Sequence, residues 1–160
     1  MIHPFEPVFD KNSLVLILGT FPSEKSREYG FFYGHPQNRF WKLIAFLTDT
    51  SKIPVSIDEK KELLLRNKIA LWDVINSCDI KKSSDASITN VVPNNLSKIL
   101  EFSSIKQIFA NGEKAYNIYM RYCYKDIGKE IIKLPSTSPA NASYSLERLK
   151  TEWKIIKVLD

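Results

Sequence analysis

The sequence predicts an α/β fold, a three-layer sandwich in which a central, mainly parallel four-stranded sheet is flanked by helices. Two observations lead to this prediction. Four short apolar runs rich in Ile and Val end at or near turn residues, which is typical of buried parallel strands. Segments with a helical spacing of apolar residues alternate with these runs. A length of 160 residues fits one domain spanning residues 1–160.

The predicted strands are defined by where their apolar runs stop. They are residues 14–18, ended by Gly19; residues 69–75; residues 105–110, ended by Asn111 and Gly112; and residues 130–134, ended by Pro135. Residues 153–159 are a candidate for a final short strand. The predicted helices between them are residues 38–47, 58–67, 95–102, 113–122 and 146–153.

Composition and charge limit the class of protein. The net charge of +5 favours a polyanionic partner such as nucleic acid. No apolar run approaches the ~18 residues of a membrane span, and no basic stretch followed by an apolar one marks a secretory signal. The two cysteines, Cys78 and Cys123, form no CxxC motif, which is typical of ordinary thiols in a reducing cytosol. We therefore expect a cytoplasmic protein that has no membrane partner.

Ligands of open α/β sheets bind beyond the carboxyl ends of the strands. This rule directs attention to residues 19–41, 76–95, 111–114 and 135–144. The first of these segments is long and rich in aromatic residues, and such loops are often functional. Residues 111–114 lie where the third predicted strand ends, and residues 135–144 are dense in hydroxyl groups.

Two of these loops carry residue types suited to a planar base and a phosphate. Gly19 lets backbone approach a ligand closely, and aromatic rings nearby can stack on a planar base. Asn38 suits chemistry, but it equally suits the cap of the helix that follows. The hydroxyls of residues 136–138 suit a phosphate, although an ordinary Ser/Pro turn has the same composition.

Three motifs occur in a fixed order along the chain. They are Gly19-Thr20-Phe21-Pro22-Ser23 after the first strand, His35-Pro36-Gln37-Asn38-Arg39-Phe40-Trp41 at the first helix, and Pro135-Ser136-Thr137-Ser138-Pro139-Ala140-Asn141 after the last strand. This set resembles the uracil-DNA glycosylase superfamily over about residues 14–153. It is most similar to the hypoxanthine-DNA glycosylase branch, and the second motif is also similar to the mismatch-specific uracil/thymine branch.

The resemblance implies a monofunctional DNA glycosylase of base excision repair. Such an enzyme flips a deaminated base out of double-stranded DNA, hydrolyses its N-glycosidic bond and leaves an abasic site. Hypoxanthine is the favoured base and uracil the second, with single-stranded DNA left open as a substrate. No cofactor and no metal is expected, and such enzymes are usually monomers.

The resemblance also assigns roles to individual residues. Asn38 is the catalytic residue, orienting either the attacking water or the base edge. The predicted base pocket consists of Gly19, Thr20, Phe21, Pro22, Phe32 and Asn111, with Phe31 and Tyr33 as alternatives to Phe32 for stacking. The predicted DNA contacts are Ser23, Arg39, Ser136, Thr137, Ser138 and Asn141. Arg39 has a local salt bridge as its alternative.

Phe21 departs from the family pattern. Most branches have Asp or Asn there to hold the hydrolytic water, and a phenylalanine can neither orient nor deprotonate water. A non-catalytic DNA-binding relative therefore stays open as an alternative function. A nucleoside or nucleotide hydrolase on a similar sheet is the other alternative, because it would use the same strand-end crevice and aromatic stacking.

Several polar residues have a simpler interpretation. We expect His35 to support its loop, His3 to be incidental and Asp73 to be structural. The polar loop of residues 77–90 is expected to line one side of the DNA groove, with Lys81 and Lys82 on a solvated face.

Overall fold

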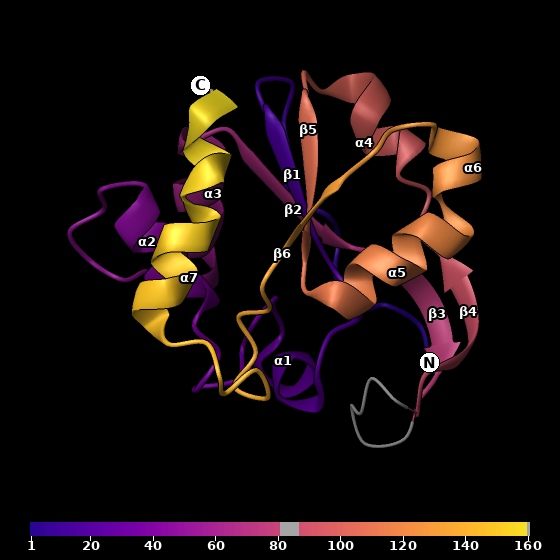
Figure 1. The fold of residues 1–160 in the computed structure, drawn as a ribbon, viewed down its shortest axis with the longest axis horizontal. Coiled ribbons are helices and arrows are strands. Elements are labelled where there is room, and N and C mark those ends of the chain that lie inside the picture. The colour runs from indigo at the N-terminus through magenta and orange to yellow at the C-terminus, as the bar shows by residue number, and fades with distance from the viewer. Residues whose placement is uncertain (81–86, 160) are drawn as a thin grey trace.

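The computed structural model describes residues 1–80 and 87–159 and has the predicted layered α/β architecture (Figure 1). Four parallel strands form one sheet in the order β2-β1-β5-β6. They are β1 (Val15–Gly19), β2 (Ile69–Asp73), β5 (Gln107–Asn111) and β6 (Ile132–Leu134). An antiparallel pair, β3 (Ile75–Asp79) and β4 (Thr89–Pro93), forms a second small sheet. Lys81 and Lys82 lie outside the described residues.

The predicted helices are present, with ends that differ by at most two residues. The helices are α1 (Glu24–Tyr29), α2 (Phe40–Leu47), α3 (Ile57–Arg66), α4 (Ser97–Phe102), α5 (Glu113–Tyr122), α6 (Tyr124–Ile127) and α7 (Leu146–Trp153). The short helices α1 and α6 were not predicted from the sequence. In the described part of the chain, no helix has the length and apolar character needed to cross a membrane.

The sheet is buried on both faces, which explains why its strands are continuous apolar runs. On one face, Val15 and Ile17 pack with the apolar residues of α2, α3 and α7. On the other face, Leu16 and Leu18 pack with residues of α4 and α5. All five residues of β1 are buried, and the alternation places successive side chains in opposite layers.

The second predicted strand is divided in two. Residues 69–75 were expected to form one strand, but β2 ends at Asp73 and β3 begins at Ile75. The break occurs at Val74, whose N–H donates to the carbonyl of Gly19 at the end of β1. β3 then pairs with β4 and leaves the central sheet.

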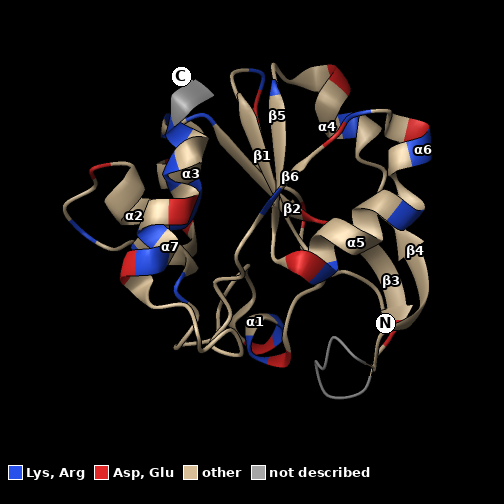
Figure 2. Ribbon diagram, in the orientation of Figure 1, with Lys and Arg blue, Asp and Glu red and all other residues tan. Residues whose placement is uncertain are grey.

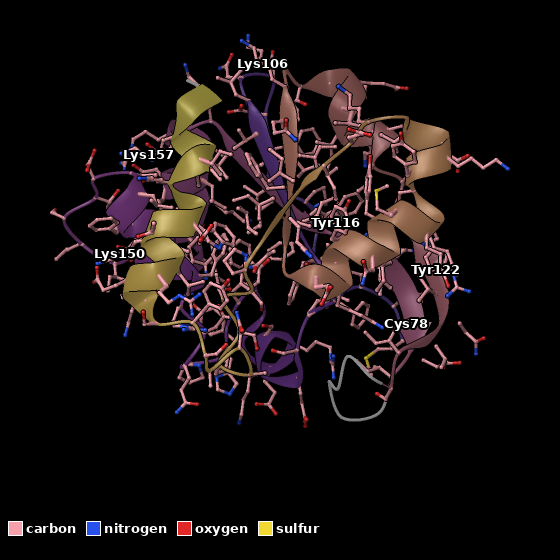
Figure 3. The ribbon with its side chains drawn as sticks, viewed as in Figure 1. Cys78, Lys106, Tyr116, Tyr122, Lys150 and Lys157 are labelled. Carbon is pink, nitrogen blue, oxygen red and sulfur yellow. The ribbon has the colours of Figure 1, made fainter. Side chains whose placement is uncertain are left out.

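The candidate strand at residues 153–159 is wrong. The 3₁₀ helix η2 (Lys154–Leu159) follows α7 directly. Trp153 and Ile156 are both buried in the core while Ile155 between them is partly exposed, so the apolar spacing is helical rather than alternating. Lys157 pairs with Asp49 at 3.6 Å, and Figure 3 shows Lys150 and Lys157 on the outer side of the molecule.

The N-terminal segment crosses the end of the sheet. Val8 forms an antiparallel bridge with Leu71 of β2, and Ile2 forms one with Ser77 of β3. The segment between these bridges therefore passes Asp73, the last residue of β2. This path brings His3 to the carboxyl ends of the strands.

Candidate functional site

A cavity of about 350 Å³ lies at the carboxyl ends of the central strands. It is lined by all the residues predicted for the base pocket: Gly19, Thr20, Phe21, Pro22, Phe32 and Asn111. Asn38, Ser23 and residues 136–138 line it as well. The loop after β6 reaches this edge of the molecule, near α1 (Figure 1).

A second cavity of about 590 Å³ adjoins the first. Ser136 and Ser138 line both cavities, whereas Asn141 lines only the second. Lys106, at the other end of the sheet where β5 begins, marks the opposite side of the molecule (Figure 3).

The side-chain amide of Asn38 has a fixed orientation. Its Oδ1 accepts hydrogen bonds from the N–H of Phe40 at 3.0 Å and from the hydroxyl of Thr137 at 2.8 Å. Because a backbone N–H can only donate, the amide atom facing Phe40 is the oxygen. The Nδ2 group has no partner among the described residues, so Asn38 offers the cavity hydrogen-bond donors.

The capping interpretation of Asn38 is therefore correct in part. Arg39 is the N-cap residue of α2 and its side chain makes no capping bond. Asn38, one residue earlier, instead accepts the N–H of the first helical residue. The oxygen that accepts the N–H of Phe40 thus also fixes the orientation of the amide at the cavity. Asn38 can therefore cap α2 and serve the cavity at the same time.

Thr137 connects Asn38 to Asn111. The Oδ1 of Asn111 accepts the N–H of Thr137 at 3.0 Å, and its Nδ2 donates to the Thr137 hydroxyl at 3.1 Å. That hydroxyl must then donate its own hydrogen to Asn38. The structure corrects the phosphate-contact prediction for Thr137, because this residue is fully buried and its N–H and hydroxyl hydrogens are engaged.

Arg39 holds the loop after β6. Its guanidinium donates to the carbonyls of Thr137 at 3.3 Å, Ser138 at 2.9 Å and Asn141 at 3.2 Å, and also to that of Tyr144. Neither predicted role is observed. Arg39 forms no salt bridge within the described residues, and its donors face loop carbonyls rather than an open surface.

Of the remaining predicted DNA contacts, Ser136 and Ser138 keep donors available. The hydroxyl oxygen of Ser136 accepts the N–H of Ser138 at 3.1 Å, and that of Ser138 accepts the N–H of Ala140 at 3.1 Å. Each hydroxyl can still donate its hydrogen to an oxyanion. The Asn141 side chain donates to the carbonyl of Ser136 at 3.0 Å and so braces the loop.

The aromatic residues of the first loop divide between cavity and core. Phe32 and Tyr33 line the cavity, whereas Phe31 packs against Trp41 with ring centroids 6.0 Å apart. Phe32 is only 2% exposed, and its carbonyl accepts the indole N–H of Trp41 at 3.0 Å. The ring of Tyr33 stacks on that of Phe40, with ring centroids 4.2 Å apart.

His35 supports its loop, as expected. Its ring Nδ1 accepts the N–H of Gln37 at 3.0 Å, and its carbonyl accepts the N–H of Asn38 at 3.0 Å. The ring does not line either cavity.

A buried pair at the cavity was not predicted from the sequence. His3 was expected to be incidental and Asp73 structural, but the Nε2 of His3 lies 2.8 Å from Oδ2 of Asp73. Because His3 Nδ1 accepts the N–H of Phe5, the ring hydrogen is on Nε2 and donates to the carboxylate. Asp73 lines the cavity and is 4% exposed. Its place at the end of a strand was the one available signal.

The known proteins that are similar to this chain have names that agree with the family that the motifs resemble. A family model described as the uracil DNA glycosylase superfamily matches residues 6–160. A Methanosarcina acetivorans protein named hypoxanthine DNA glycosylase is 33% identical over 155 residues, which cover 95% of each chain. A Methanosarcina barkeri protein of the same name is 33% identical over 152 residues, or 93% of each chain. A solution NMR structure of a Methanosarcina acetivorans protein matches 99% of each chain, with a TM-score of 0.83 and 33% identity.

Proposed function

Because the chain belongs to the uracil DNA glycosylase superfamily, we propose that it is a DNA glycosylase that releases hypoxanthine from DNA. Two similar proteins named hypoxanthine DNA glycosylase support this substrate. The observation that carries the proposal is the cavity at the strand ends, which is lined by residues of all three motifs, among them Asn38 with its donor face.

The reaction requires the damaged base to leave the duplex. Unstacking a base costs a few kcal/mol, and less when the base is mispaired. Hypoxanthine arises from adenine and is mispaired opposite thymine, so it flips more readily than a normal base. A cavity of about 350 Å³ is within the usual range for a small ligand and accepts one base.

Asn38 acts as a hydrogen-bond donor in this proposal. Both lone pairs of its oxygen are directed to Phe40 and Thr137, so it cannot take a proton from water. Its Nδ2 hydrogens can bind an acceptor atom of the departing base, on which negative charge develops as the glycosidic bond breaks. This removes the need for a carboxylate at the position of Phe21, because stabilising the leaving group drives the bond cleavage.

Neutral groups make the flanking DNA contacts. Residues 135–144 contain no Lys or Arg, and Figure 2 shows the basic residues spread over several helices and strands instead. The hydroxyls of Ser136 and Ser138 are the proposed phosphate donors. Ser23 lines the same cavity, but its hydroxyl donates to that of Ser26 at 3.0 Å and accepts the N–H of Ser26 at 3.1 Å, so it caps α1 instead of offering a free hydrogen. The net charge of +5 supplies the general attraction to DNA.

The finer substrate profile follows from the same site. We propose uracil as a slower second substrate, double-stranded DNA as the normal form, and a monomer acting in the cytoplasm as a single domain. Phe21 provides no water-binding group, so the rate depends on how readily the base departs. Uracil, as the poorer leaving group, should therefore be released more slowly than hypoxanthine.

End-labelled duplexes that carry hypoxanthine, uracil, xanthine or mismatched thymine test the proposed function. After incubation with the protein, hot alkali breaks the strand at every abasic site. We expect the strongest cleavage at hypoxanthine. Cleavage at no lesion, with DNA binding retained, would contradict the proposal and favour a non-catalytic DNA-binding relative.

A further inference from the structure

The floor of the cavity carries polar groups that the chemistry of Asn38 does not use. Gly19 ends β1 and is in register with Asp73 at the end of β2. A Cβ atom on Gly19 would lie 2.4 Å from Asp73 Oδ1 and 2.8 Å from the Tyr33 hydroxyl. Both polar groups therefore lie directly over the Gly19 backbone, and only glycine leaves them room.

Asp73 presents an acceptor at this floor. Its Oδ2 is held by the Nε2–H of His3, whereas Oδ1 is the atom that lies over Gly19. Asp73 is the one carboxylate among the described residues that line the cavity. An ionised carboxylate can only accept hydrogen bonds, so Oδ1 selects for a donor on the ligand.

Tyr33 presents a donor beside it. Its hydroxyl is buried and has no hydrogen-bond partner among the described residues. Burial, followed by the nearby Asp73 carboxylate, raises the pKa of Tyr33, and the nearby Asn111 side chain lowers it by less, so the hydroxyl keeps its hydrogen. The Asn111 amide already bonds to Thr137 and does not meet the geometry of a hydrogen bond to Tyr33. An unmet buried donor is costly, and a ligand that enters the cavity can meet it.

We propose that Asp73 Oδ1 accepts the ring N–H of the flipped base while the Tyr33 hydroxyl donates to the adjacent carbonyl oxygen. This inference rests on the proposed function and adds the residues that select the base. Deamination of adenine converts N1 from an acceptor to an N–H donor and replaces the 6-amino group by O6. Adenine offers the opposite pattern, so the pair recognises hypoxanthine and disfavours the parent base.

The position at the floor agrees with the shape of a purine. The N1 and O6 edge is the part of hypoxanthine farthest from N9, where the sugar is attached. A base that enters from the DNA therefore brings this edge to the deepest residues of the cavity. His3 is then a positioning residue, because it touches Asp73 and holds the carboxylate in place.

The test compares two bases in otherwise identical duplexes. Hypoxanthine has N1–H and O6, whereas the purine base of deoxynebularine has an acceptor at N1 and no oxygen at C6. Single-turnover rates are measured for the wild type and Asp73→Asn. In the variant, His3 holds the amide oxygen, so the NH₂ group faces N1–H and two donors oppose each other. We expect hypoxanthine release to fall by about 100-fold or more, and purine release to fall far less.

Controls separate recognition from folding. Asp49→Asn makes the same change at an exposed carboxylate that pairs with Lys157, and it should leave both rates unchanged. Tyr33→Phe removes a hydroxyl with no partner among the described residues, so stability should hold while hypoxanthine release falls and purine release is spared. This second variant gives the answer if Asp73→Asn does not fold.

The role of His3 has its own comparison. His3→Phe keeps a ring between Phe5 and Phe21 but removes the donor to Asp73, so the preference for hypoxanthine over purine should fall. His3→Gln restores a donor near the same position and should recover part of this preference.

The outcomes distinguish the two proposals. Equal slowing of both bases in Asp73→Asn and Tyr33→Phe, or no slowing, would overturn the assignment of these residues to base recognition. A wild type that releases no hypoxanthine would overturn the proposed function itself, and this inference with it.

Discussion

The hydroxyl of Thr137 donates to the side-chain oxygen of Asn38 across 99 residues of sequence, at 2.8 Å. This bond joins the loop after β6 to the start of α2 and fixes which face of the Asn38 amide meets the cavity. Asn111 completes the connection, since its amide donates to the same hydroxyl. Three residues from three separate segments thus act as one unit.

Thr137→Val removes this connection while keeping the shape of the side chain. Asn38 then has one restraint fewer and Asn111 loses its acceptor. The free energy of unfolding should fall by about 1–3 kcal/mol, and the single-turnover rate by about 10-fold or more. Urea unfolding and hypoxanthine release measure the two effects. Thr151→Val, on the exposed face of α7, is the matched control and should change neither. Full activity in Thr137→Val would show that Asn38 needs no such restraint.

Gly19→Ala should close the floor of the cavity. The added Cβ would meet Asp73 Oδ1 at 2.4 Å and the Tyr33 hydroxyl at 2.8 Å, so these groups must move. Misplaced groups of this kind lower rates on the order of 100-fold. Gly128→Ala is the control, because its φ of +75° makes it strained although nothing lies within 4 Å. Gly128→Ala should lose stability yet keep its activity, and similar activities of the two variants would argue against a role for the floor.

Arg39 should be a loop clamp rather than a phosphate contact. Arg39→Met removes the hydrogen bonds to the Ser138 and Asn141 carbonyls, so amide hydrogen exchange in residues 136–141 should accelerate. The slope of log affinity for DNA against log salt concentration should not change. Loss of a phosphate contact would lower that slope by about one instead, which would restore the original prediction.

The buried thiols should make stability sensitive to alkali. Burial raises the pKa of Cys123 from 9.0 to about 11. Because the folded state holds this proton more tightly, the contribution to stability is complete below pH 9 and is lost as the pH rises toward 11. Urea unfolding at a series of pH values should show this decline, and Cys123→Ala should reduce it. An identical decline in Cys123→Ala would assign it to other groups, such as Tyr119.

The sequence predicted the sheet well because its strands are buried on both faces. Each residue of β1 is apolar or glycine, so the strand is visible without any structure. The failure at the C-terminal end of the described chain occurs where the same apolar residues suit both a strand and a helix. Residues 153–159 are apolar enough for a strand, yet they continue α7 as a 3₁₀ helix because Trp153 and Ile156 bury on a helical spacing.

The sequence predicted which residues line the candidate site, but it did not predict the hydrogen bonds that join them. The motifs identified Asn38 and Thr137, the end of the third predicted strand identified Asn111, and the strand-end rule placed their loops together. Residue type could not show that Thr137 is buried or that Arg39 faces carbonyls, because both facts depend on how two distant loops meet. His3 was missed for the same reason, since the N-terminal segment reaches Asp73 only through long-range bridges.

The most direct test of the donor role is the single-turnover rate of hypoxanthine release by Asn38→Asp beside Asn38→Ala. Aspartate keeps an oxygen for Phe40 and Thr137 but replaces the free NH₂ group by a second acceptor. If Asn38 donates to the departing base, Asn38→Asp should be at least as impaired as Asn38→Ala, by about 100-fold or more. An Asn38→Asp variant that equals or exceeds the wild type would contradict the donor role and show that this position activates water.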